Sequence, residues 1–191
     1  FISSWFVYGE TSLPAKEENE CRPKGFYSIT KKCAEDLIIS YCKTFKMNYR
    51  IMRLCNVYGV GDSGVSKKKN ALQYMIDLLK KDEQVNLYHD GKFFRDYMHV
   101  EDVCKAINTV IVKGNYNEIY NISSGEKYLM KDIIDTCVQI TNSKSKIVAI
   151  DSPEFHKIVQ VKNMYLDNKK LLNLGFVQKF NLQDGLRLLC K

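Results

Sequence analysis

Apolar residues recur along the chain with two periods, one typical of amphipathic helices and one typical of short buried strands. The longest helical stretch is residues 27–45, where apolar side chains lie three and four positions apart. Asn70 is a candidate cap for a second helix, and Gly114 and Gly175 follow two others, as glycine often does at helix ends. Further helices are predicted at residues 72–79, 101–112, 130–140, 167–174 and 184–190.

Short apolar runs between these helices predict strands, and the segment Asn56-Val57-Tyr58-Gly59 after one of them predicts a turn. Strands that alternate with helices indicate an α/β protein with a mainly parallel sheet. The predicted strands are residues 1–4, 49–55, 85–88, 94–100, 119–122 and 146–150.

The composition is that of a globular protein with a real core. The 191 residues are 45% hydrophobic, which suits one large domain or two small ones. The net charge of +7, with both signs mixed along the chain, indicates either a basic, lysine-rich surface or attraction for an anionic ligand such as a phosphate. The densest basic run, Lys67-Lys68-Lys69, is too short and too poor in aromatic neighbours to indicate nucleic-acid binding.

Cysteine usage indicates a reducing compartment, so we expect a cytoplasmic protein. The seven cysteines show no C-x-x-C spacing and several lie in apolar helical patterns, which predicts buried thiols and no disulfide frame or zinc site. The three histidines are far apart, so we expect no metal site. No apolar run approaches the ~20 residues of a membrane-spanning helix, so we expect no membrane partner.

Tyr27 and Lys31 lie four positions apart in the longest predicted helix, so their side chains point the same way. A tyrosine titrates near ~10, too high for a base at neutral pH, and a neighbouring ammonium favours the phenolate. The pair predicts a proton shuttle, with a serine hydroxyl from the strand that ends at Ser3-Ser4 holding the substrate oxygen. The alternative for this pair is a half-buried tyrosine beside a snorkelling lysine.

Six groups of residues occur in an order that is typical of one enzyme family. They are Ser3-Ser4 with Val7-Tyr8-Gly9-Glu10; Tyr27 with Lys31; residues 53–59 (RLCNVYG); residues 95–103 (RDYMHVEDV); Tyr120-Asn121-Ile122 with Gly125; and Asp167 with Leu174-Gly175-Phe176. Together they resemble the C-terminal portion of an extended short-chain dehydrogenase/reductase, more narrowly of the NAD-dependent nucleotide-sugar epimerase/dehydratase family.

The resemblance implies an α/β fold: the C-terminal part of a Rossmann-like doubly wound parallel sheet plus a smaller mixed α/β substrate-binding domain. We expect residues 1–60 to belong to the NAD-binding domain, with some later segments packing back on it, and residues 61–191 mainly to bind the nucleotide-sugar. The glycine-rich turn that binds the dinucleotide in this family is not among these residues, so we expect a longer protein.

The resemblance also implies roles for single residues. Tyr27 would be the catalytic acid/base, and Lys31 would bind the nicotinamide ribose and lower the pKa of Tyr27. Ser4 would assist Tyr27 in catalysis. Cys55 would contact the cofactor through its backbone. The implied cofactor is NAD, and NADP stays open.

Substrate contacts are implied at six further positions. Asn56 matches the position that binds the substrate's diphosphate, with a plain turn residue as its alternative. Arg95 matches a pyrophosphate clamp, a role that suits the bidentate guanidinium. Lys157 matches a second phosphate ligand that is usually an arginine. The segments that cradle the nucleotide base and ribose are matched by Asn70, Asn86 and Tyr88. For Arg53 we favour a structural ion pair.

The implied activity is that of a nucleotide-sugar epimerase acting through a keto-sugar intermediate. A 4,6-dehydratase of this family also needs an Asp-Glu pair directly after the catalytic serine or threonine, and here those positions are Trp5 and Phe6. A keto-sugar reductase needs only Ser4, Tyr27 and Lys31 and stays open, as does a non-catalytic nucleotide-binding module. The resemblance implies a nucleotide-diphosphate sugar as ligand and a homodimer. The sugar and the nucleotide are not specified.

Overall fold

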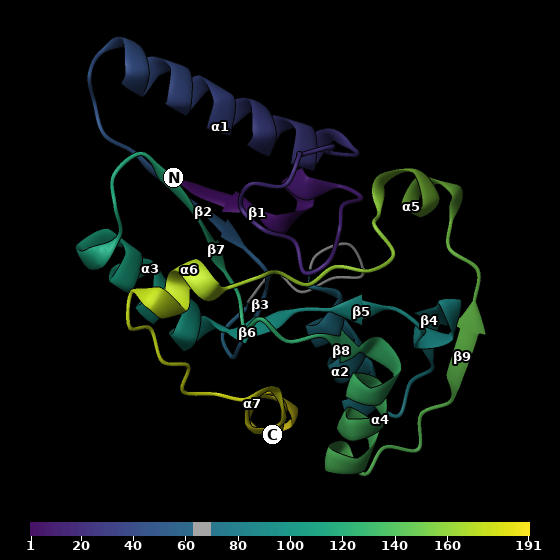
Figure 1. Cartoon of the computed structure of the whole chain (residues 1–191). Helices are drawn as coiled ribbons and strands as arrows, with labels where there is room; N and C mark the ends of the chain where they lie inside the picture. The colour runs from purple at the N-terminus through teal and green to yellow at the C-terminus, as the bar shows by residue number, and fades with distance from the viewer. Residues whose placement is uncertain (63–69) are drawn as a thin grey trace.

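A computed structural model of the chain describes residues 1–62 and 70–191. Its central sheet contains three parallel strands, β1 (Ile2–Ser4), β2 (Arg50–Leu54) and β7 (Glu118–Ile122), in the order β1-β2-β7. The long helix α1 (Phe26–Thr44) lies on one face of this sheet, and α3 (Val100–Lys113) lies on the other (Figure 1). This arrangement of parallel strands between helices is an α/β layer structure.

The register of the central sheet places polar side chains in one row. Ser3 of β1 is the pairing partner of Arg53 in β2, and Arg53 is the partner of Asn121 in β7. Since paired residues point to the same face, this row lies on the side of the sheet that carries α1. All three residues are buried.

Further strands form three short pairs. Two pairs are parallel, β3 (Asn56–Tyr58) with β6 (Tyr97–His99) and β4 (Val85–Tyr88) with β9 (Ile147–Ile150). The third pair, β5 (Phe94–Arg95) with β8 (Tyr128–Leu129), is antiparallel. The remaining helices are α2 (Ala71–Lys80), α4 (Met130–Thr141), α5 (Glu154–Val159), α6 (Lys169–Asn173), α7 (Leu182–Cys190), and the 3-10 helices η1 (Trp5–Tyr8) and η2 (His89–Gly91).

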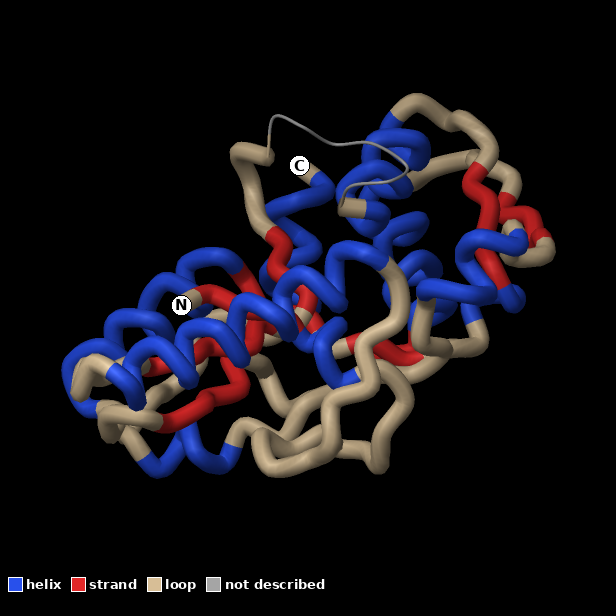
Figure 2. The backbone as a smooth tube through the Cα atoms, turned by 90° about the horizontal axis from the view of Figure 1, so that it is seen from above, coloured by secondary structure: helices blue, strands red, loops and turns tan. Residues whose placement is uncertain are grey.

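Buried apolar side chains form two clusters. The first cluster packs the central sheet against α3, η1 and residues 161–176. The second cluster packs α2, α4 and α7 together with β4 and is separate from the first. In Figure 2 the central sheet and its helices occupy the end of the molecule near the N label, and the second cluster lies beyond them toward the other end. Several segments beyond residue 60 thus contact the first cluster, and the division at residue 60 stays a prediction.

Most predicted elements are present, and the α/β fold with parallel strands is confirmed. The predicted turn at 56–59 was wrong, because Asn56–Tyr58 pairs with β6 as strand β3. The predicted strand 94–100 is interrupted at Asp96, whose buried carboxylate accepts hydrogen bonds from outside the strand. The run Lys67-Lys68-Lys69 lies outside the described residues. Within the described ranges, no helix is long and apolar enough to span a membrane.

Candidate functional site

The candidate site begins at the first turn of α1. Gly25 precedes the helix with φ of 80°, a left-handed conformation that glycine adopts without steric cost. Ser28 is buried and donates a hydrogen bond to the Gly25 carbonyl at 3.0 Å, which closes this turn. Tyr27 is 57% exposed, so its phenol lies at the protein surface and can reach a ligand.

Lys31 connects α1 to the edge strand β1. Its ammonium donates to the carbonyl of Ile2 at 2.9 Å and lies 5.9 Å from the ring centroid of Tyr27. The same ammonium is 5.1 Å from the ring centroid of Phe1. The predicted neighbourhood of Tyr27 and Lys31 is therefore present, and β1 contributes its carbonyl to it.

Ser4 ends β1 and leads directly into η1. Its side chain is buried, and its hydroxyl accepts a hydrogen bond from the Phe6 backbone N–H at 3.4 Å. The Phe6 ring lies edge-on to the Tyr27 ring, with centroids 6.0 Å apart. These contacts bring the chain around Ser4 to the same place as Tyr27 and Lys31.

Two aromatic residues separate Ser4 from the rest of η1. The rings of Trp5 and Phe6 stack at 3.8 Å, and Trp5 is almost fully buried. Neither an indole nor a phenyl ring can act as a general acid or base at neutral pH. The positions that follow Ser4 therefore contribute shape and hydrophobic surface to the site rather than proton transfer.

Cys55 and Asn56 lie at the carboxyl end of β2. Cys55 is buried, its backbone N–H donates to the carbonyl of Ile122 at 2.9 Å, and burial raises the pKa of its thiol. The Asn56 side-chain amide donates to the Asp96 carbonyl at 2.9 Å. Asn56 thus helps to hold β3 beside β6, and its predicted contact with a diphosphate stays a prediction.

Arg95 is committed to backbone carbonyls. Its guanidinium donates to the carbonyls of Phe94 and Lys162 and to that of Val161, over distances of 2.6 to 2.9 Å. It also lies 5.5 Å from the Trp5 ring centroid, and desolvation lowers its pKa. In this arrangement Arg95 fixes residues 161–162 beside η1, so a phosphate would have to share or displace these hydrogen bonds.

Asp96 is a buried carboxylate behind the site. It accepts hydrogen bonds from the Ser124 backbone N–H at 3.2 Å, the Ser124 hydroxyl at 2.7 Å and the Leu166 backbone N–H at 3.2 Å. Desolvation outweighs these contacts and raises the pKa of Asp96 to about 6. Asp96 therefore ties β5 and β6 to the end of β7 and to the segment around Leu166.

The other predicted substrate residues lie farther along the chain and around different elements. Asn70 caps α2, accepts from the Gln73 backbone N–H at 3.3 Å and donates to Asp62 at 3.0 Å. Asn86 is exposed on β4 and accepts from Gln84.

Tyr88 and Lys157 are brought near each other through α5. The ring of Tyr88, at the end of β4, lies 5.0 Å from the ring of His156. Lys157, the next residue, is exposed and 3.6 Å from Glu154. This pair of predicted contacts thus shares one region around α5.

Two features of this region were not predicted from the sequence. Helix α5 ends beside the start of α1, because a Cβ built on Gly25 would lie 2.9 Å from Cβ of Val159. Glu35 forms a buried ion pair with Arg53, which confirms the predicted structural role of Arg53. The spacing of Glu35, four residues after Lys31, would instead have indicated a pair with Lys31, so no signal in the sequence indicates the pairing of Glu35 with Arg53.

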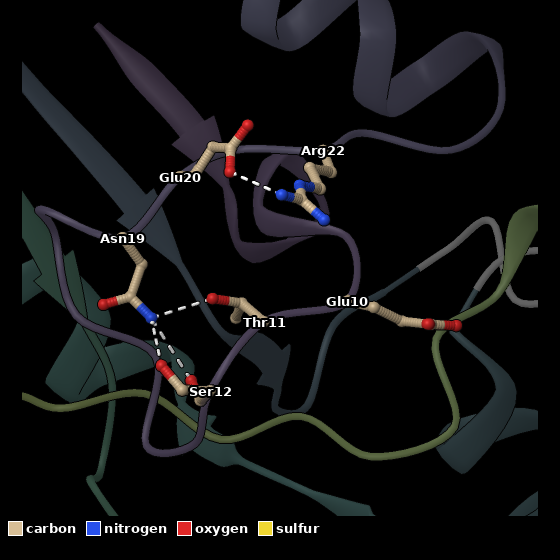
Figure 3. Close-up of a pocket in the computed structure, with 6 residues that line it drawn as sticks. All are labelled: Glu10, Thr11, Ser12, Asn19, Glu20 and Arg22. Carbon is tan, nitrogen blue, oxygen red and sulfur yellow. Dashed lines mark hydrogen bonds and ion pairs between the residues drawn. The ribbon is translucent and has the colours of Figure 1, made fainter.

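A hollow in the loop after η1 is not part of this site (Figure 3). Asn19 bridges its walls by donating to the hydroxyls of Thr11 and Ser12, each at 2.8 Å, and Arg22 pairs with Glu20 at 2.7 Å. The polar groups of this loop are thus held by one another. Among residues 1–62 and 70–191, no group of three His, Cys, Asp or Glu side chains could hold a metal ion.

The fold is that of an α/β protein whose long helix carries Tyr27 and Lys31 close to the strand that ends at Ser4. The model of the NAD dependent epimerase/dehydratase family matches residues 1–123, and the chain belongs to this family. The family has members with different activities, so membership alone does not specify the reaction.

Individual relatives show this range. The chain is 28% identical over 187 residues to a putative UDP-glucose 4-epimerase of Methanocaldococcus jannaschii, covering 95% of this chain and 57% of that protein. It is 29% identical over 195 residues to a trifunctional UDP-glucose 4,6-dehydratase/UDP-4-keto-6-deoxy-D-glucose 3,5-epimerase/UDP-4-keto-L-rhamnose-reductase of Arabidopsis thaliana, covering 97% of this chain and 28% of the relative.

A solved structure supports the fold. The chain superimposes with a TM-score of 0.86 and 25% identity on the UDP-glucuronic acid 4-epimerase of Bacillus cereus in complex with UDP-glucuronic acid and NAD. The match covers 98% of this chain and 58% of that structure. The chain thus spans little more than half the length of this protein and of the archaeal relative.

Proposed function

We propose that the chain is part of an NAD-dependent nucleotide-sugar 4-epimerase, with NADP as an open alternative cofactor. The observation that carries this proposal is the position of the Lys31 ammonium, which bonds to the β1 carbonyl of Ile2 and lies 5.9 Å from the Tyr27 ring. The Lys31 ammonium thus contacts the strand that ends at Ser4, and the Tyr27 ring contacts Phe6, which lies two residues after Ser4. A tyrosine, a lysine and a serine are the groups needed to move a proton on a sugar hydroxyl.

In the proposed complex, one set of residues would hold a nicotinamide cofactor and another set would act on the sugar substrate. Lys31 would hold the nicotinamide ribose, and the Cys55 backbone would contact the same cofactor. A bound nicotinamide supplies hydride transfer. Tyr27 would take the proton from a sugar hydroxyl as the carbon loses hydride, and would return it when the hydride returns. Ser4 would hold the sugar oxygen during both steps.

The remaining predicted contacts are proposed for the nucleotide. Asn56, Arg95 and Lys157 would bind the diphosphate, because amide and cationic donors suit phosphate oxygens. Asn70, Asn86 and Tyr88 would contact the base and ribose. The first apolar cluster also contains many residues beyond residue 60, because later segments pack back on it. We propose that residues 1–60, together with some of these later segments, belong to the cofactor domain and that residues 61–191 mainly form the substrate domain.

A homodimer is part of this proposal. The carboxyl-terminal half of α1 presents Leu37, Tyr41 and Phe45 to solvent, with exposed fractions of 70%, 57% and 59%. An apolar stripe of this kind on a surface helix is typical of a helix that packs against a partner.

A keto-sugar reductase is the second candidate, since it uses the same three side chains. Trp5 and Phe6 disfavour 4,6-dehydration, because neither ring can supply the additional acid and base. Incubation of the complete protein with UDP- and dTDP-sugars tests these proposals. An isomeric sugar nucleotide without net change at 340 nm supports the epimerase, and steady NAD(P)H consumption supports the reductase. A product lighter by one water would contradict both, and nucleotide binding without turnover would leave a non-catalytic module.

A further inference from the structure

A buried ion pair joins the long helix to the central sheet. Arg53 donates from Nη2 to Glu35 Oε2 at 2.7 Å and from Nε to Glu35 Oε1 at 3.0 Å. Both side chains are excluded from solvent, with exposed fractions of 3% for Arg53 and 1% for Glu35. Two parallel hydrogen bonds between planar groups fix direction as well as distance.

Glu35 follows Tyr27 and Lys31 along the same ridge of α1. The three residues are spaced by four positions, which places them on one inclined row of the helix surface. Along this row exposure falls from the half-exposed Tyr27, through the partly buried Lys31, to the fully buried Glu35. A constraint on Glu35 is therefore a constraint on the direction in which Tyr27 points.

Arg53 contacts the other half of the candidate site at the same time. Its guanidinium lies 4.7 Å from the ring centroid of Tyr8, the last residue of η1, which follows Ser4 directly. Its Nη1 donates to the carbonyl of Glu17 at 3.2 Å, and the Tyr8 hydroxyl donates to Asn121 at 2.7 Å. One guanidinium thus lies between the helix that carries Tyr27 and the segment that carries Ser4.

The start of α1 needs such an anchor. Gly25 provides no side-chain cap, so the first turn is held by backbone bonds and by Ser28. The firm attachments of the helix to the sheet lie further along, at Lys31 with Ile2 and at Glu35 with Arg53. Apolar side chains would also attach the helix, but they would leave its rotation and axial position less defined, because apolar contacts are non-directional.

We propose that Glu35 and Arg53 are positioning residues for the reaction: they set the rotation of α1 so that Tyr27 and Lys31 face the strand of Ser4. This inference rests on the proposed function, since it assigns the ion pair a purpose in proton transfer. A buried ion pair contributes little net stability compared with apolar residues of similar size. Its directional hydrogen bonds are what apolar residues cannot replace.

The test replaces the pair by flexible apolar residues in the complete protein. The double variant E35M/R53M removes both charges together, so no unpaired charge is buried and the protein is expected to fold. We expect kcat to fall about 10- to 100-fold with KM unchanged, because a displacement of about 1 Å at the reacting group has effects of this size. The pH profile of kcat should shift as well. Cys42→Ala, a buried change on α1 outside the pair, should leave both quantities unchanged.

A folded double variant with the kcat and pH profile of the wild type would overturn the inference. Should the double variant not fold, Arg53→Lys replaces it. Lysine keeps the charge but cannot form the paired hydrogen bonds. The same fall in kcat is expected for Arg53→Lys, and a wild-type rate with a native circular-dichroism spectrum would overturn the inference equally.

A readout without turnover separates this inference from the proposed function. With 3-fluorotyrosine at position 27, the ¹⁹F resonance reports the surroundings of that ring. We expect the chemical shift of this resonance to differ between the wild type and E35M/R53M, and to be unchanged in Cys42→Ala. Absence of turnover in the wild type would count against the proposed function alone. An identical ¹⁹F chemical shift in both proteins would count against the positioning role alone.

Discussion

The Phe6 ring stands edge-on to the Tyr27 ring, with the two ring centroids 6.0 Å apart. The Phe6 ring covers one side of Tyr27, which is 57% exposed. The other neighbour is the Lys31 ammonium. The phenol of Tyr27 is therefore bounded by an apolar ring on one side and by a cation on another, and each neighbour makes a separate prediction.

Tyr27→Phe should abolish turnover and leave stability unchanged. Removing a general acid/base costs about 10²- to 10⁴-fold in rate, and this hydroxyl lies at the surface with no core contact to lose. The measurement is isomer formation by the complete protein, with thermal unfolding in parallel. Tyr41→Phe is the matched control, because Tyr41 lies on the same helix with the same exposed fraction of 57%. Equal activity of the two variants would show that Tyr27 is not the acid/base.

Phe6→Leu should lower both kcat and stability, because the ring contacts Tyr27 as well as Trp5. Leucine keeps the apolar character of the partly buried position but has no ring edge to place against Tyr27. Loss of one aromatic contact costs about 0.5–1.5 kcal/mol, so we expect a decrease of three- to tenfold in rate, on the order of that energy. Phe6→Tyr, which keeps the ring, should restore most of the rate. If leucine and tyrosine variants behave alike, the ring contact has no role in catalysis.

Gly25→Ala should destabilise the protein through two separable effects. The φ of 80° strains any residue with a Cβ, at a cost of about 1–3 kcal/mol, and the new Cβ would lie 2.9 Å from Val159. Denaturant unfolding of Gly25→Ala, Val159→Ala and the double variant measures both. In the double variant, the destabilisation caused by the clash with Val159 should disappear, and the destabilisation caused by φ at position 25 should remain. Strict additivity of the two single changes would show that α5 does not press against the start of α1.

The buried carboxyl group of Asp96 should make the free energy of unfolding depend on pH, with the larger stabilisation at low pH. Burial raises its folded-state pKa to about 6, above its usual value of 3.8, so the folded protein binds the proton more tightly than the unfolded chain. The stabilisation by this group is complete below about pH 4 and is lost as pH rises through about 6. Its size is on the order of 3 kcal/mol, since one pKa unit corresponds to ~1.4 kcal/mol.

The comparison of wild type with Asp96→Asn isolates this carboxyl group. Asparagine does not titrate, so the stability of the wild type relative to the variant should decrease between pH 4 and pH 7. Urea unfolding at several pH values measures this difference. A difference that grows with pH would mean that the hydrogen bonds from Ser124 and Leu166 outweigh desolvation.

The sequence allowed the local features to be predicted. The helix 26–44 and the proximity of Tyr27 to Lys31 follow from spacing within one element. The strand β3 and the bonds of Arg95 to the carbonyls of Val161 and Lys162 did not follow, because the partners lie 40 residues or more away in sequence. The short helix α5 was missed because it has only six residues, so its apolar positions Phe155, Ile158 and Val159 are too few to establish a helical period.

The path of the chain between the two apolar clusters limits how this protein can move. Residues 161–176 pack in the first cluster, although they follow α4 and β9, which lie at the second cluster. The Leu166 backbone pairs with Ala15 and donates a hydrogen bond to Asp96. The chain therefore passes between the two clusters more than once. A hinge motion between the clusters would have to bend all of these connecting segments together, whereas a hinge consists of only a few residues. Adjustment to ligands of different size is therefore expected at helix α5, none of whose residues is buried, rather than at a hinge between the two clusters. Because α5 ends beside Gly25, such a change would be transmitted directly to the turn that carries Tyr27.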